Sequence, residues 1–347
     1  MPFGVGLLFL AVVAGLLEAA LAARGFRPSV GDSPAVWGRE RTRASEVGPD
    51  GLILVGASRS QLDIDLGVLG RVTGKHPVQL AIDGSSFLPV LADLARDDRV
   101  TGTVIVEFGG SIPDPAHQDA ATHYVDVWRR GRHLGARYDF AWMEGSLVDW
   151  RQGILRSYAD GSGPLNALSR RVLPRTVTPQ YLVTLPSGSR EADYLKVDMP
   201  AFYFRRVMRN AGIDDLPDLP DYAAVNRYLS DRIQALPRAS AAHLVESATA
   251  MGQIVRKIEA RGGEVIFVMY PRSGLVRAAD DVRYPRAVFW DHVVPLAGGK
   301  GLYSADEPSL RDFICPDGSH LDVRDKRRFT EALAKALESR GWIRVGS

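Results

Sequence analysis

Apolar and polar residues follow three distinct patterns along this chain, and the first is an apolar run at its start. Residues 3–23 are apolar or small almost without interruption, and Glu18 is their single charge. As a helix at about 1.5 Å per residue, this run would reach roughly 31 Å, which matches the hydrocarbon core of a bilayer. A carboxylate near the end of such a run costs less than one at its centre, and the Leu, Phe and Val residues outweigh it. We therefore expect residues 1–24 to form a transmembrane anchor or a signal segment.

Two features bear on the cleavage and the orientation of this segment. The small residues "AALAA" before Arg24 are typical of a cleavage site, but the basic residues that begin a signal peptide are missing. An uncleaved, single-pass anchor is therefore the favoured interpretation. The positive-inside rule by itself would keep the following chain in the cytoplasm, because the run is followed by Arg24, Arg27, Arg39, Arg41 and Arg43.

After a stretch rich in Arg, Pro, Gly and Ser, short apolar runs alternate with amphipathic segments. We interpret residues 25–50 as a juxtamembrane linker. Apolar runs at 51–57, 76–83, 102–108 and 264–271 predict buried strands, and amphipathic segments at 59–74, 87–98, 241–263 and 324–341 predict helices. Strands that alternate with helices indicate a doubly wound parallel sheet of α/β class, whose sites lie beyond the carboxyl ends of the strands.

The regular pattern is lost between about residues 112 and 240. Tryptophans and proline-containing stretches such as "LPRTVTPQYLVTLPSG" replace it, and they indicate irregular structure with short helices. We therefore predict one α/β domain over residues 51–347, in which a long insertion at about 112–240 forms a cap.

Composition narrows the classes of function. The 347 residues carry 43 Lys and Arg against 41 Asp and Glu, a net charge of +2, so no basic field argues for a nucleic-acid partner. Cys315 is the single cysteine, which excludes an intramolecular disulfide. No spacing typical of metal ligands emerges. We expect neither a metal nor a cofactor.

Small and polar residues follow the predicted strands. They are Gly56-Ala57-Ser58, Asp83-Gly84 and Gly109-Gly110, and "CPDGSHLD" at 315–322 precedes the last helix. A serine hydroxyl needs a base to become a nucleophile, histidine is the usual base, and a carboxylate orients the imidazole. Asp317 and His320 could supply both partners for Ser58. The plainer alternatives are that Ser58 caps a helix and that the last segment is only a turn.

Taken together, these segments resemble the SGNH/GDSL hydrolase superfamily. The family's first block Gly-Asp-Ser, its glycine after the second strand, and its last block Asp-x-x-His are matched by Gly56-Ala57-Ser58, by Gly84 in "AIDGSS", and by Asp317-Gly318-Ser319-His320. The resemblance covers roughly residues 50–112 and 240–345 and implies a three-layer α/β/α fold. It also implies Ser58 as nucleophile, His320 as base and Asp317 as its partner, with the backbone N–H groups of Ser58 and Gly84 in an oxyanion hole.

Two positions depart from the family pattern. Ala57 replaces the aspartate of the first block, which is not a member of the triad. The family's third block, Gly-x-Asn, places an asparagine in the oxyanion hole, but "EFGG" at 107–110 offers none. Loss of one such donor costs about 10²–10³ in rate. A backbone N–H of Gly109 or Gly110 is the expected substitute, and Arg59 is a further candidate for binding substrate.

An anchored SGNH-like domain with a large insertion is most similar to a branch that modifies bacterial envelope polysaccharides. This branch includes the alginate O-acetylation proteins and the D-alanyl–teichoic acid transfer protein. The resemblance implies an acyl-enzyme on Ser58 that passes its acyl group to a sugar hydroxyl or to water. It implies an acylated carbohydrate or acyl donor as ligand and a membrane-bound O-acyltransferase as partner. An extracytoplasmic domain is also implied, because long domains translocate largely regardless of charge.

Two other classes of function stay open. A non-catalytic SGNH-like scaffold would dock an acyltransferase or a glycan, and the missing asparagine favours it. A nucleotide-binding α/β domain would need a glycine-rich phosphate loop. The segment "VGASRS" at 55–60 lacks the further glycines of a dinucleotide fingerprint, and no Lys-Ser/Thr phosphate loop occurs.

Overall fold

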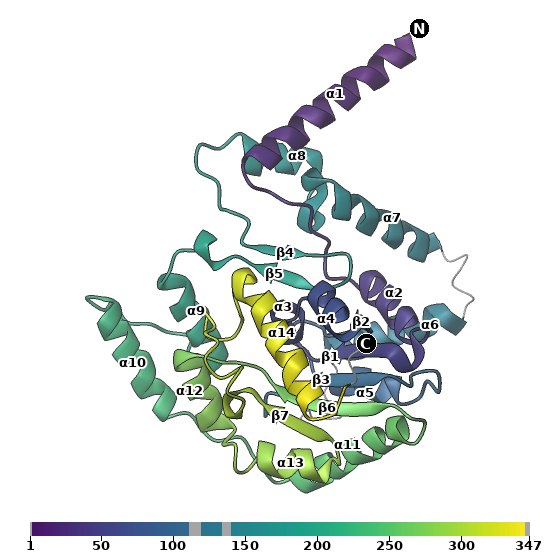
Figure 1. Cartoon of the computed structure of the whole chain (residues 1–347). Coiled ribbons are helices and arrows are strands. Elements are labelled where there is room, and N and C mark those ends of the chain that lie inside the picture. The colour runs from purple at the N-terminus through teal and green to yellow at the C-terminus, as the bar shows by residue number, and fades with distance from the viewer. Residues whose placement is uncertain (1, 111–118, 134–139, 344–347) are drawn as a thin grey trace.

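The computed structural model describes residues 2–110, 119–133 and 140–343, and its centre is a five-stranded parallel sheet (Figure 1). The strands are β1 (Gly51–Val55), β2 (His76–Gln79), β3 (Thr103–Glu107), β6 (Glu264–Met269) and β7 (Lys300–Tyr303). They are hydrogen-bonded in the order β2-β1-β3-β6-β7, and every neighbouring pair is parallel. The predicted α/β class with a parallel sheet is confirmed.

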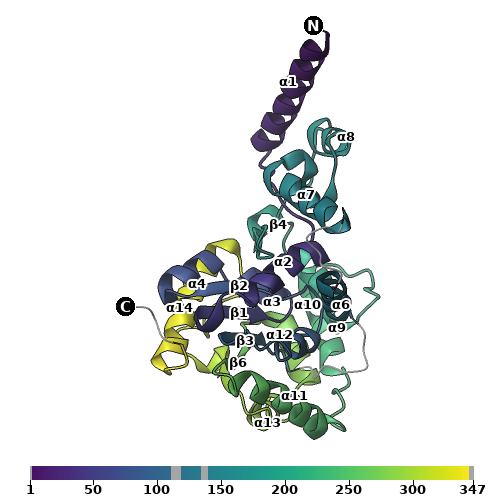
Figure 2. The same ribbon diagram turned by 90° about the vertical axis from the view of Figure 1, so that its right-hand side faces the viewer.

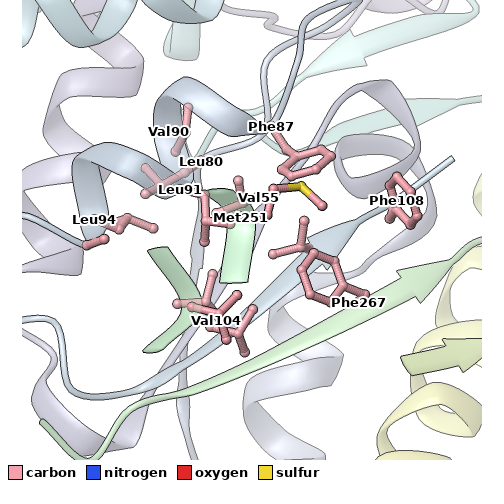
Figure 3. Packing of buried hydrophobic residues seen from close by; sticks show 14 of the residues in the cluster. Val55, Leu80, Phe87, Val90, Leu91, Leu94, Val104, Phe108, Met251 and Phe267 are labelled. Carbon is pink, nitrogen blue, oxygen red and sulfur yellow. The ribbon is translucent and has the colours of Figure 1, made fainter. Parts of the chain in front are cut away.

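Helices cover both faces of this sheet, because alternate residues of each strand point to opposite sides. The helices of this core are α3 (Ser58–Asp63), α4 (Leu66–Thr73), α5 (Leu88–Leu94), α11 (Leu244–Glu259), α12 (Gly274–Arg283), α13 (Trp290–Leu296) and α14 (Val323–Ser339). Helices α5, α11 and α13 share one buried core with Ile53 and Phe267 of the sheet. Helices α4 and α14 share the other with Leu54 and Ile266. In the first core, Phe108 and Phe267 lie edge to face with ring centroids 6.1 Å apart (Figure 3).

The strand order contains a reversal between β1 and β3. From β1 the chain passes to β2 on one side, and it then returns beyond β1 to β3 on the other side. Sheets of this kind bind ligands at such a reversal, outside the carboxyl ends of the strands. The fold therefore favours a ligand site beside the residues that follow β1 and β3.

One long apolar helix, α1 (Pro2–Ala23), projects from the α/β domain (Figures 1 and 2). Its residues Gly4–Ala23 are long and apolar enough to cross a membrane, and the same properties suit a signal sequence. The length and composition of α1 thus suit a membrane anchor or a signal sequence.

The segment expected to be a linker, residues 25–50, instead contains a packed helix. Helix α2 (Pro34–Ala44) begins after Ser33, whose hydroxyl accepts the N–H of the third residue of the helix. Trp37 donates from Nε1 to the carbonyl of Leu80 at 3.0 Å, so the helix is fixed beside the end of β2. The stretch rich in Arg, Pro, Gly and Ser suggested a linker, but Arg41 is fully buried and paired with Asp93.

The insertion is more ordered than its sequence indicates. Its elements are α6 (Ala120–His133), α7 (Phe140–Ile154), η3 (Arg156–Gly161), α8 (Pro164–Ala167), η4 (Leu168–Val172), β4 (Leu182–Thr184), β5 (Arg190–Ala192), η5 (Tyr194–Lys196), α9 (Ala201–Ala211) and α10 (Tyr222–Gln234). Strands β4 and β5 form an antiparallel hairpin, and α9 and α10 pack against α12 of the core. The predicted start of the insertion, at about residue 112, lies outside the described residues.

Two further differences from the predicted pattern have local causes. The amphipathic segment 59–74 is divided into α3 and α4, because Ile64 is extended and Asp65 caps α4 by accepting the N–H of Val68. Strand β7 is missed by the pattern, because it lies at the edge of the sheet and only Leu302 among its four residues is buried.

We expect Arg41→Ala to lower the free energy of unfolding by about 3 kcal/mol, because it removes a buried cation from a buried carboxylate. Arg41 donates from Nε to Asp93 at 2.6 Å, and Arg129 is left as the remaining partner of that carboxylate. Urea unfolding followed by circular dichroism measures the change. The exposed Arg96→Ala should change stability by less than about 0.5 kcal/mol, and an equally small change for Arg41→Ala would contradict the packing of α2.

Candidate active site

Ser58 is the first residue of α3, at the carboxyl edge of the sheet. The chain leaves β1 through Gly56, whose φ of +152° and close approach to the Glu107 side chain leave no room for a Cβ. The Glu107 carboxylate accepts the backbone N–H groups of Ala57 at 2.8 Å and Ser60 at 3.0 Å, and so it caps α3. The N-cap position is Ala57. Ser58 is therefore not the cap of this helix, and its hydroxyl bonds elsewhere.

The Ser58 hydroxyl meets the loop that precedes α14. Nε2 of His320 lies 2.7 Å from Oγ of Ser58, and Nδ1 of His320 lies 2.8 Å from Oδ2 of Asp317. Asp317 and His320 are almost entirely buried, whereas Ser58 is partly exposed. The structure thus brings together the three residues that the sequence singled out, and we call them the triad.

Asp317 itself shapes the loop that carries His320. Its Oδ1 accepts the backbone N–H groups of Ser319 at 2.9 Å and His320 at 2.8 Å, which is a turn typical of aspartate. Gly318 adopts a φ of +84°, and a Cβ there would collide with Val276 of α12. The segment is therefore a turn, as its sequence suggests, and the same turn presents His320 to Ser58.

The hydrogen bonds indicate which nitrogen of His320 carries the proton. An ionised carboxylate can only accept, so Nδ1 donates to Asp317 and Nε2 is left to accept from the Ser58 hydroxyl. This places the imidazole as a base toward the serine oxygen.

Two side chains of the insertion complete the surroundings of Asp317. Arg206 of α9 donates from Nε to Oδ2 of Asp317 at 3.0 Å, and burial beside Asp317 raises the pKa of the Tyr194 hydroxyl well above its ordinary value. Tyr194 is held by its backbone N–H, which donates to Asp322 at 2.9 Å. Neither residue carries a signal in the sequence, because both lie where no regular pattern distinguishes one arginine or tyrosine from another.

These contacts keep Asp317 ionised. Burial by itself would raise the pKa of this carboxyl. The hydrogen bond from His320, the positive charge of Arg206 and the N–H of Ser319 lower the pKa by more than burial raises it. The pKa of Asp317 is therefore lowered well below its ordinary value. A carboxylate that stays charged orients the imidazole and stabilises the imidazolium that forms when His320 accepts a proton.

Arg59 links three parts of the site. It donates from Nε to the carbonyl of Ser319 at 3.2 Å, and its guanidinium lies 3.4 Å from Asp280 and 3.8 Å from Glu107. Burial lowers the pKa of Arg59, but the two carboxylates raise it by more. Arg59 therefore ties α3 to the loop of the triad, and its role toward a substrate stays a prediction.

The three glycines expected in the oxyanion hole follow β2 and β3, the two strands that flank β1. Gly84 lies in the exposed loop after β2, Gly109 lies against the guanidinium of Arg59, and Gly110 packs against Tyr284. Among the contacts of the described residues, none of these glycines hydrogen-bonds a member of the triad. Their oxyanion role therefore stays a prediction.

A pocket of about 660 Å³ lies between the chain that leaves α1 and the β4–β5 hairpin, and we call it the hairpin pocket. Arg190 lines it and donates to Asp32 at 2.9 Å and to Asp83, after β2, at 2.7 Å. Two guanidinium nitrogens of its lining residues, Nε of Arg190 and Nη1 of Arg171, are buried without a hydrogen-bond partner among the described residues. Charged and polar side chains thus line the pocket.

The hairpin pocket adjoins the triad through two tyrosines. Tyr181 lines the pocket, and its ring centroid lies 6.3 Å from that of Tyr194, which lies beside Asp317. Two tyrosine rings therefore separate the pocket from Asp317.

Within residues 2–110, 119–133 and 140–343, no group of three or more His, Cys, Asp or Glu side chains is placed to hold a metal ion. Comparison with protein-family models, curated proteins and solved structures finds no match for this chain. Its function therefore has to follow from the site itself.

The lowered pKa of Asp317 predicts a specific dependence of stability on pH. Because the folded-state pKa is below the unfolded-state value of about 4, the charge stabilises the fold above that pH, and the contribution is lost as the pH falls through the folded-state pKa. We expect the stability advantage of the wild type over Asp317→Asn to shrink by roughly 1 kcal/mol between about pH 6 and pH 3 in urea unfolding. The exposed Asp312→Asn is the matched control and should show no such trend. A constant difference for Asp317→Asn would contradict the ionised state.

Proposed function

We propose that this protein is an SGNH-like serine esterase or O-acyltransferase that acts on an envelope or extracellular polysaccharide through an acyl-enzyme on Ser58. The observation that carries this proposal is the chain of short contacts from Ser58 through His320 to Asp317. A serine oxygen 2.7 Å from an imidazole nitrogen, which a buried carboxylate orients, is arranged for activation by a general base.

The arrangement supports acyl transfer in two steps. As Oγ of Ser58 attacks the ester carbonyl, its proton passes to Nε2 of His320, and His320 returns that proton to the departing alcohol as the ester C–O bond breaks. Water or a sugar hydroxyl then attacks the acyl-serine and gives its proton to His320, which returns it to Ser58. The second product is a carboxylic acid or a new ester.

Backbone N–H groups would stabilise the oxyanion that develops in each step. The first N–H groups of a helix have no intrahelical acceptor, and those of Ala57 and Ser60 already bond to Glu107. The N–H of Ser58 donates no hydrogen bond among the contacts of the described residues. The family resemblance assigns it and Gly84 to the oxyanion hole.

The hairpin pocket supports a hydroxyl-rich ligand. Each sugar hydroxyl both donates and accepts hydrogen bonds. The pocket offers the carboxylates of Asp32 and Asp160 as acceptors and the guanidinium groups of Arg171 and Arg190 as donors. A simple anion would be repelled by the two carboxylates, whereas a glycan can use both kinds of partner. We infer that the pocket holds part of a glycan substrate.

The apolar helix α1 supports a place of action at a membrane. On this proposal the α/β domain lies on the extracytoplasmic side, where envelope polysaccharides are modified. Its partner is a membrane-bound O-acyltransferase that exchanges acyl groups with it.

A non-catalytic scaffold is the second candidate, and the end of β3 favours it. SGNH hydrolases place an asparagine donor in this block, but here Glu107 is engaged in capping α3, and Gly109 and Gly110 have no side chain. A scaffold of this kind would hold a glycan or an acyltransferase without forming an acyl-enzyme.

Ser58→Ala tests the acyl-enzyme. We expect the release of acetate from para-nitrophenyl acetate to fall by about 10⁶ in kcat, to the background rate, because the nucleophile is lost. The exposed Ser309→Ala is the matched control and should keep wild-type activity. Activity retained by Ser58→Ala would contradict the acyl-enzyme, and a folded wild type that releases no acetate would favour the scaffold.

Filling the hairpin pocket should impair glycan substrates selectively. Thr178 lines the pocket, and the exposed Thr176 does not. We expect Thr178→Trp to lower kcat/KM for an acetylated xylan oligosaccharide about tenfold or more, while that for para-nitrophenyl acetate stays unchanged. Thr176→Trp should leave both values unchanged. If Thr178→Trp also leaves both unchanged, or lowers both equally, the pocket is not a sugar site.

A further inference from the structure

Helix α7 has one face against the domain and an opposite face that is apolar and exposed. On the inner face, Asp149 accepts from Arg39 at 2.8 Å and Gln152 accepts the N–H of Gly31 at 2.6 Å. Leu147, Trp150 and Ile154 are each more than half exposed. At 100° per residue these three point to the side opposite Asp149 and Gln152. The outer face of α7 therefore points away from the α/β domain.

The segment that follows α7 adds further exposed apolar side chains beside α1. Helix α8 and turn η4 contact α1, and Leu165 and Leu173 are 82% and 69% exposed. Figures 1 and 2 show α8 at the foot of α1, and in Figure 1 α7 extends sideways from there. We define the platform as the exposed apolar residues Leu147, Trp150, Ile154, Leu165, Leu168 and Leu173. Such a concentration marks an interaction surface.

Glu18 is the single charged residue of α1, and it is hydrogen-bonded by the segment that follows α7. The carboxylate of Glu18 accepts the backbone N–H groups of Arg156 and Ser157, both at 2.9 Å. Leu21 of the last turns packs in a small core with Phe26. Glu18 therefore contacts other parts of the protein. The part of α1 on the N-terminal side of Glu18 projects from the domain, and its apolar residues from Val5 to Leu16 are exposed.

Several arginines lie close in the sequence to the platform residues or to the end of α1. Arg24 donates to the carbonyl of Pro174 at 2.9 Å, and Arg170 and Arg175 are exposed nearby in the sequence. Apolar side chains, a tryptophan and arginines together at the end of a membrane-length helix are typical of a segment that lies at the headgroup level of a bilayer.

We propose that the platform is immersed in the headgroup–acyl boundary of the bilayer that holds α1. The occupant of this surface is lipid, because the surface continues the exposed apolar face of α1 and carries the cations that suit anionic headgroups. The proposal rests on the membrane location of α1 and is independent of esterase activity. It also brings the hairpin pocket to the membrane surface, since Phe26, Arg170 and Arg171 line that pocket.

Lipid quenching of site-specific fluorophores tests the platform. The full-length protein is reconstituted in phosphatidylcholine–phosphatidylglycerol vesicles that contain lipid with a nitroxide on an upper acyl carbon. Single cysteines that carry an environment-sensitive dye replace Leu147 or Leu173. The comparably exposed Val245 and Ile314 are the matched controls, and Phe9 of α1 is the positive control. Cys315 is buried, and the unsubstituted chain gives its background labelling.

We expect emission to fall about twofold or more at positions 147, 173 and 9 and to stay unchanged at 245 and 314. Quenching at position 9 without quenching at 147 and 173 would overturn the platform and leave the anchor intact. Absence of quenching at position 9 would overturn both. Activity toward para-nitrophenyl acetate, measured on the same vesicles, reports separately on the proposed function.

Discussion

The buried charge of Asp317 is the constraint on which the rest of the site depends. A carboxylate removed from water is strongly unfavourable unless the surrounding groups donate to it. The donors here come from its own loop, through the backbone N–H groups of Ser319 and His320, from the imidazole, and from Arg206 of the insertion. Loop shape, imidazole orientation and the placement of α9 are therefore fixed together, and the insertion contributes a side chain to the site.

A second buried carboxylate holds the other side of the site. Glu107 on β3 accepts two N–H groups at the start of α3 and lies beside Arg59, which reaches the carbonyl of Ser319. Because Glu107 caps α3, the Ser58 hydroxyl is free to bond His320. The two carboxylates thus explain how residues 262 positions apart meet at 2.7 Å. The same acid that positions Ser58 stands in the block where SGNH hydrolases, which the sequence resembles, use an asparagine donor, so a proposed oxyanion hole would depend on backbone groups.

The sequence predicted the parts of this structure that depend on local pattern. Buried strands and the turn at Asp317 follow from short-range periodicity and turn chemistry, and so the meeting of Ser58 with His320 could be expected from the order of a parallel sheet. Arg206 and Tyr194 could not, because their partner lies more than a hundred residues away and nothing in their own neighbourhood marks them. Arg41 was assigned to a juxtamembrane linker for the same reason, since the carboxylates that pair with it lie in another segment.

The most direct measurement is covalent capture of Ser58. Folded full-length protein treated with a fluorophosphonate should gain one phosphonyl group by intact mass, peptide mapping should place it on Ser58, and His320→Gln should abolish the reaction because the base is lost. A folded protein that gains no adduct, or gains it at another serine, would contradict the claim that the Asp317–His320 pair activates this hydroxyl.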